Sequence, residues 1–251
     1  MSNATFPREL FELQAAYLHH RLGREPWWGM DYGFTNFTQF KAICKFAPTN
    51  HQWPRMDLDD HAWRALLAEC WTALQRHPGA DGRGSFVGFL WERWGPRWQA
   101  AFPLFDRSLL AEKYTGCFRY DFDPAQRAVH LHFHNLEAPL SPFAQPGKRK
   151  ADLRRIVAEL EQQELKPDVV SFDSWMNHLK PIQELFPKSF AAALTPAEEF
   201  PKGYGWWGQF ITRDGKIHTT RAALLREKGV FEFPRLNGHC PWSDFRDSVM
   251  S

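Results

Sequence analysis

The chain of 251 residues has few cysteines, and none of the four forms a Cys-x-x-Cys pair. A zinc site built from cysteine pairs is therefore not expected. No apolar run approaches the roughly 18 residues that a membrane-spanning helix needs, so no membrane association is expected. The first residues, Met1-Ser2-Asn3-Ala4, do not have the basic and apolar pattern of a secretory signal. These absences predict a cytoplasmic protein with reduced thiols.

A strong excess of charge is also absent. The formal net charge is +2, and basic and aromatic residues do not interleave as in RNA-binding sheets, so no nucleic-acid partner is expected. Aromatic residues, in contrast, are abundant: the chain has 12 tryptophans and 22 phenylalanines. Most of these rings are expected in a core, and some in a pocket for a small-molecule substrate. None of this composition predicts an oligomeric state.

The period of the hydrophobic pattern changes near residue 114. Before it, helical spacing is clearest over residues 57–75, with a second helix at 7–22 and a third beginning at Ser85, after a flexible link at 81–84. After it, alternation predicts a hairpin. The elements expected in this second half are strands 116–122 and 128–134, helix 150–163, strand 169–172, helix 177–186, strand 206–211 and helix 219–227.

This order predicts an α+β protein with two parts. A helical, tryptophan-rich domain is expected over residues 1–113, followed by a mixed-sheet α/β domain over 114–251. A strand–helix–strand passage needs a crossover, so part of the second domain's sheet is expected to be parallel.

Three histidines alternate with apolar residues in His130-Leu131-His132-Phe133-His134. The alternation places all three imidazoles on one face of the predicted strand. A neutral imidazole in a cleft suits proton transfer at neutral pH. The plainer interpretation is that these side chains only form hydrogen bonds on a partly solvated face of the sheet.

A metal site is a further interpretation of the same strand. Alternate residues lie ~6.6–6.8 Å apart, so His130 with His132, or His132 with His134, are possible chelating pairs. No His-Glu-x-x-His spacing accompanies them. A third ligand would have to come from Glu137, Asp173, His178, His218 or His239.

A proline-rich loop follows the strand. Pro139, Pro142 and Pro146 exclude residues 138–147 from a helix or an inner strand. The basic run 148–150 then coincides with the start of a helix, where cations are unfavourable unless an anion completes the site. The run is therefore either a solvated basic turn or, with the free amides of the helix, a pyrophosphate site.

Residues 114–225 resemble the core of the GCN5-related N-acyltransferases. In that family the edge of a hairpin strand binds the acyl-CoA arm, and a Gln/Arg-x-x-Gly-x-Gly/Ala loop at the start of the next helix holds the CoA pyrophosphate. The counterparts here are residues 129–134 and the loop Gln145-Pro146-Gly147-Lys148. Helix 150–163, strand 169–172, helix 177–186 and strand 206–211 would follow in the same order.

The resemblance implies transfer of an acyl group from CoA to an unknown amine, with acyl-CoA as co-substrate and no metal. An amine must lose a proton to attack a thioester, and the base would be His132 or His134, with Glu137 or Asp173 as alternatives. The CoA phosphates would lie against Gln145, Gly147, Lys148, Arg149 and Lys150. The acceptor pocket would be walled by Trp175, Trp206 and Trp207.

Two other classes of function stay open from the sequence. One is a metal-dependent enzyme that uses a pair of the strand histidines. The other is a non-enzymatic binding protein whose tryptophan-rich surface contacts a partner.

Overall fold

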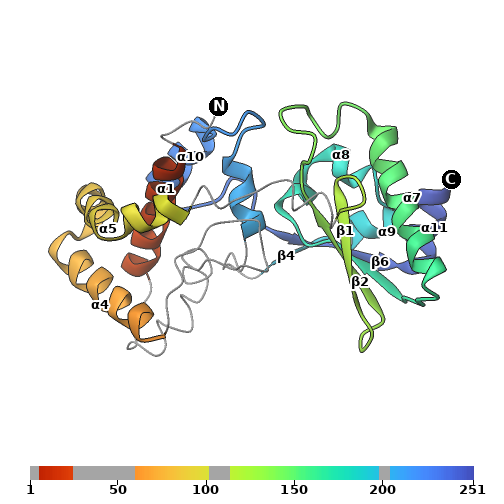
Figure 1. Cartoon of the computed structure of the whole chain (residues 1–251), viewed down its shortest axis with the longest axis horizontal. Helices are drawn as coiled ribbons and strands as arrows, with labels where there is room; N and C mark the ends of the chain where they lie inside the picture. The colour runs from red at the N-terminus through yellow and green to blue at the C-terminus, as the bar shows by residue number, and fades with distance from the viewer. Residues whose placement is uncertain (1–5, 25–59, 102–113, 198–203) are drawn as a thin grey trace. The chain divides into compact units, whose positions relative to one another are not determined.

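The computed structural model describes residues 6–24, 60–101, 114–197 and 204–251 (Figure 1). The described residues divide into two compact units. Unit 1 consists of residues 6–24, 60–101 and 204–232, and unit 2 consists of residues 114–197 and 233–251. The expectation of a helical N-terminal half followed by a mixed α/β part is confirmed.

Three long helices, α1 (Phe6–Arg24), α4 (Asp60–Arg76) and α5 (Gly79–Ala101), form most of unit 1. The predicted flexible link at 81–84 is wrong, because these residues belong to α5. A Cβ on Gly82 would lie 2.1 Å from the carbonyl oxygen of His77, so glycine lets α5 pack closely on the preceding turn. Pro96 also lies within α5.

The core of unit 1 also includes a segment that the sequence assigns to the second domain. Trp207 and Phe210 from the 3₁₀-helix η3 (Tyr204–Phe210) and Leu225 from α10 (Thr219–Lys228) are buried with the apolar side chains of α1, α4 and α5. The strand predicted at 206–211 is wrong. Gln209 and Phe210 are neighbours and both are buried, which does not fit the period of two of a half-buried strand.

Unit 2 is built on a four-stranded mixed sheet with the order β1-β2-β3-β6. The strands are β1 (Phe118–Asp123), β2 (Ala128–Phe133), β3 (Val169–Ser171) and β6 (His239–Pro241). β1 and β2 form the predicted antiparallel hairpin, β2 and β3 are parallel as the crossover requires, and β6 is antiparallel to β3. A second sheet pairs β4 (Thr195–Pro196) with β5 (Leu236–Asn237).

Helices α7 (Pro146–Gln162) and α11 (Trp242–Met250) lie along the same side of this sheet (Figure 1). Leu153 and Ile156 of α7 and Phe245 of α11 are buried against Val129 and Val170 of the strands. Short helices between β3 and β4 complete the unit: η2 (Trp175–His178), α8 (Lys180–Gln183) and α9 (Lys188–Ala192). None of the helices in the described ranges is long and apolar enough to cross a membrane.

Candidate functional site

The opposite side of the sheet carries polar side chains, and we call it the histidine face. Its members alternate along each strand with the buried residues that face α7 and α11. The register places Asp121, His130, Ser171 and His239 side by side in one row across all four strands. Arg119 and His132 form the next row on β1 and β2. The histidine face thus consists of Arg119, Asp121, His130, His132, Ser171 and His239.

His132 and Asp121 form a hydrogen-bonded pair on this face. The Nε2–H of His132 donates to Asp121 Oδ2 at 2.7 Å. The pair is diagonal across the hairpin, because the residue directly opposite His132 is Arg119. Arg119 in turn lies 3.6 Å from the same Asp121 carboxylate. With Nε2 donating to a carboxylate, Nδ1 is left with the lone pair that a general base requires.

The surroundings of His132 favour its neutral form. Burial, followed by the positive charge of Arg119, lowers its pKa below the usual value, although Asp121 acts in the opposite direction. The side chain nevertheless keeps 40% of its surface accessible. His132 is therefore neutral at pH 7 and reachable by a ligand, as a proton acceptor must be.

The other two strand histidines point to different partners. His130 Nδ1 lies 2.7 Å from the Ser171 hydroxyl, and the His134 ring lies 6.1 Å from the ring of Tyr114. Within the described residues, no group of three or more His, Cys, Asp or Glu side chains is arranged to hold a metal ion. The geometry of this face thus gives no support to the metal-dependent alternative.

The strands β2 and β3 part next to His132. They pair only over Ala128–His130 and Val169–Ser171. The N–H of His134 donates to the Cys117 carbonyl on the β1 side at 2.9 Å, so the peptide groups of Phe133 point to the other edge. In the part of the chain that the structure describes, no strand lies along that edge beyond His130. This end of β2 therefore carries peptide groups that no strand among the described residues pairs with.

Five charged side chains join the loop after β2 to helix α7, and we call them the ionic cluster: Glu137, Lys148, Arg149, Asp152 and Arg155. Arg149 is only 1% exposed and contacts Glu137 Oε1 at 2.8 Å and Asp152 Oδ2 at 3.1 Å. Lys148 also contacts Glu137, at 2.5 Å. Hydrogen bonds from Lys148 and then Arg149 hold the pKa of Glu137 below its usual value. The cluster fixes the loop against the start of α7.

This arrangement changes the predicted phosphate site. Arg149 points into the protein and its charge is compensated there, so a phosphate-binding role for it does not fit its burial. Lys148 is 53% exposed, and Gln145 and Gly147 are exposed as well. Lys150 is half-buried. No side chain caps the start of α7, but Pro146 has no N–H and the Lys148 N–H donates to the Gln145 carbonyl at 3.0 Å. Of these first three residues, at most Gly147 has an N–H left for an anion.

The two carboxylates predicted as alternative bases contact cations. Asp173 pairs with Arg235 at 3.0 Å and accepts the Gly238 N–H at 3.3 Å, so it braces the β5 region. Glu137, the other alternative base, is held by two cations of the ionic cluster. Both carboxylates are thus engaged in ion pairs.

Of the three predicted pocket tryptophans, two have described side chains. Trp175 is half-buried and stacks on Phe233 with the ring centres 6.1 Å apart. Trp207 lies in the core of unit 1 at 1% exposure, so it does not line a ligand pocket. The side chain of Trp206 falls outside the described residues.

Sequence reasoning missed Arg119, which lies directly opposite His132, and Asp121, which accepts its hydrogen bond. Both belong to the alternating run Phe118-Arg119-Tyr120-Asp121-Phe122, whose polar positions share a face. Pairing the two strands through the short turn at 124–127 would have placed them opposite His130 and His132. Comparison of the chain with protein-family models, with curated proteins and with solved structures found no match.

Proposed function

We propose that unit 2 transfers an acyl group from acyl-CoA to an amine, with His132 as the general base. The observation that carries the proposal is the parting of β2 and β3 beside His132. The open strand edge and the neutral imidazole lie next to each other on β2. An acyl transfer to an amine needs both features, because it requires a held thioester and a proton acceptor within reach.

The proposed reaction is the addition of an amine to the thioester followed by loss of the thiolate. His132 Nδ1 takes a proton from the attacking amine as its nitrogen forms a bond to the thioester carbonyl carbon. Peptide N–H groups at the open edge of β2 are suited to stabilise the negative charge that develops on the carbonyl oxygen. The bond from carbon to sulfur then breaks, and the thiolate that leaves recovers a proton, so the products are an amide and free CoA.

Asp121 orients the base. Its carboxylate accepts the Nε2–H of His132, which fixes the tautomer with Nδ1 unprotonated. Asp121 also raises the pKa of His132 against the larger lowering effect of burial. Asp121 is therefore a positioning residue that tunes the basicity of His132.

The start of α7 supplies a site for the CoA phosphates. Its first turn has no side-chain cap and no acidic residue. A Cβ on Gly147 would meet no atom within 4 Å, so the backbone there is open to a ligand. Lys150 follows the inward-pointing Arg149 and adds positive charge, whereas the charge of Lys148 is shared with Glu137.

The decisive experiment measures CoA binding by calorimetry and acyl transfer by release of free CoA thiol, with acetyl-CoA and a panel of small amines. His132→Gln is expected to lower kcat by roughly 10²–10⁴-fold with little change in CoA affinity. Asp121→Asn is expected to shift the acid limb of the pH–rate profile to lower pH, because it removes a charge that raises the pKa of His132. His61→Gln is the matched control, since His61 is exposed on α4 in unit 1.

Three results would contradict the proposal at different points. Absence of CoA binding by the wild-type chain would overturn the function. Full activity in His132→Gln would move the base elsewhere. The third result concerns a double variant in which Lys148 and Lys150 are both changed to Gln, with the exposed Lys166→Gln as control. Equal CoA affinity in the two variants would overturn the phosphate site.

A further inference from the structure

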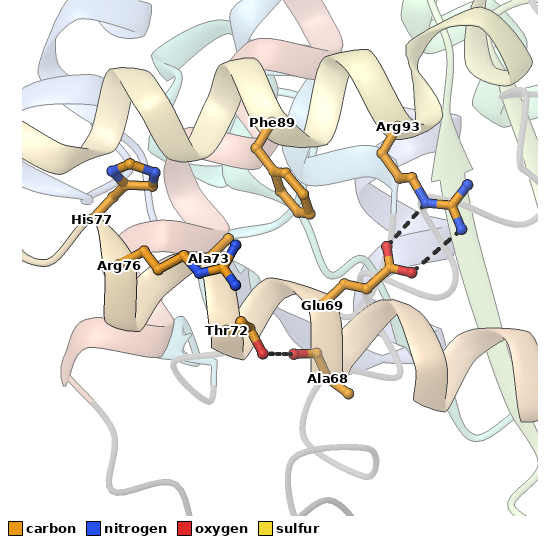
Figure 2. A pocket seen from close by; sticks show the side chains of 8 residues that line it. All are labelled: Ala68, Glu69, Thr72, Ala73, Arg76, His77, Phe89 and Arg93. Atoms are coloured by element: carbon orange, nitrogen blue, oxygen red, sulfur yellow. Dashed lines mark hydrogen bonds and ion pairs between the residues drawn. The ribbon is translucent and has the colours of Figure 1, made fainter.

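A cleft of about 500 Å³ lies between α4 and α5 in unit 1 (Figure 2). Its volume is in the range of small-molecule sites. All of its lining side chains come from the two helices and the turn that joins them. The polar and aromatic ones are Glu69, Thr72, Arg76, His77, Phe89 and Arg93.

The charge in this cleft is not balanced. Arg93 contacts both carboxylate oxygens of Glu69, at 3.1 and 3.3 Å, so these two charges neutralise each other at one end. Arg76 has no ion-pair partner among the described residues, although its place in the last turn of α4 suits the helix dipole. The cleft therefore holds one positive charge, that of Arg76, without an ion-pair partner among the described residues. An anion would balance it.

Much of the rest of the lining is apolar. Phe89 reaches from α5 toward α4, between His77 on one side and the Arg93–Glu69 pair on the other (Figure 2). Ala68 and Ala73 provide small apolar surfaces on α4. The Thr72 hydroxyl donates to the Ala68 carbonyl of its own helix at 3.0 Å, so its proton is not offered to a ligand. A flat apolar group packs favourably on such a wall.

We propose that this cleft binds a small aromatic carboxylate. Arg76 pairs with the carboxylate, and the ring packs on Phe89. At the other end of the cleft Glu69 and Arg93 pair with each other, so a second charged group on the ligand is not needed there. The proposal is independent of the acyl transfer assigned to unit 2, because every residue involved belongs to unit 1.

The test titrates the full chain with 3-phenylpropionate and with the neutral 3-phenylpropan-1-ol, followed by calorimetry and by amide chemical shifts of α4 and α5. The carboxylate is expected to bind with one site and about five-fold more tightly than the alcohol, the size typical of a partly exposed ion pair. Arg76→Gln is expected to remove this difference. Arg213→Gln is the matched control, because Arg213 is an exposed residue of the same unit outside the cleft.

Phe89→Leu separates the ring contact from the charge. It is expected to weaken both ligands to a similar degree while circular dichroism shows the helices unchanged. If 3-phenylpropionate does not bind at a concentration of 10 mM, the proposal is overturned. A dissociation constant of that size corresponds to a binding free energy of roughly −3 kcal/mol. Equal affinity for 3-phenylpropionate in Arg76→Gln and in the control Arg213→Gln overturns the proposal as well, because the carboxylate would then bind elsewhere.

Discussion

Replacing Asp152 by alanine tests the ionic cluster that fixes the loop after β2. The Asp152 carboxylate is fully buried and contacts the buried Arg149 at 3.1 Å. Removing one partner of a buried ion pair costs about 3–5 kcal/mol, because a charge is left without compensation. The N–H of Cys117, which donates to Asp152 Oδ2 at 3.1 Å, also loses its acceptor. Glu137 still contacts Arg149, so we expect a loss of about 3 kcal/mol, at the low end of the range.

Two further variants separate charge from packing. Changing Arg149 to Met together with Asp152 to Leu removes both charges, and this double variant is expected to lose less stability than Asp152→Ala alone. Glu161→Gln breaks the ion pair of Glu161 with Arg246, in which both side chains are about half exposed. That exposed pair is expected to contribute only about 0.2–1 kcal/mol.

Hydrogen exchange followed by mass spectrometry is the suitable assay, because peptides from β1 and α7 report on unit 2 separately from unit 1. Asp152→Ala should lower the protection of both elements by the expected free energy. A loss below about 1 kcal/mol would place the buried pair in the class of exposed ones and refute the reasoning. A double variant less stable than the single one would refute it too.

Three other predictions follow from the same structure. Gly116→Ala should lower the free energy of unfolding, measured by urea titration, by about 2 kcal/mol or more. The reason is that φ at Gly116 is +67° and the new Cβ would lie 2.0 Å from Asp152 Oδ1. Gly147 has open space around it, so the control Gly147→Ala should change the same free energy by less than about 0.5 kcal/mol. Burial lowers the pKa of His19 from its ordinary 6.5. The unfolded chain therefore binds the proton more readily, and the thermal stability should fall as the pH drops below that ordinary value. His19→Gln should make the stability depend less on pH. If the pH dependence of this variant equals that of the wild type, His19 is not its source. Burial raises the pKa of Cys240 to about 12, so iodoacetamide should alkylate it only after denaturant is added, as peptide mapping would show.

Much of unit 2 could be predicted from local patterns. The period of two over residues 116–134 predicts both the hairpin and a polar face, because alternate side chains of a strand must point the same way. The apolar spacing of Leu153, Ile156 and Leu160 likewise predicts the buried face of α7. The parallel pairing of β2 with β3 follows from the crossover.

The candidate site could be predicted only in part. The three histidines mark the face, but their alternation does not say which of them has a carboxylate partner. The hairpin register decides that, because it brings Asp121 to His132 Nε2. The run Lys148-Arg149-Lys150 reads as one basic patch, yet successive residues of a helix point about 100° apart, so Arg149 faces inward while Lys148 faces solvent.

The sequence by itself determined the local elements and their faces, since these depend on side chains a few positions apart. Tertiary structure alone decided which core each segment joins. Residues 204–232 lie between strands β4 and β5 of unit 2 along the chain, yet Trp207 and Leu225 are buried with α1, α4 and α5. Hydrophobic burial is non-directional. A pattern of apolar residues therefore indicates that a face must be buried, but it does not identify the element that packs against it. The same holds for the cleft between α4 and α5, whose charges meet only because the two helices pack side by side.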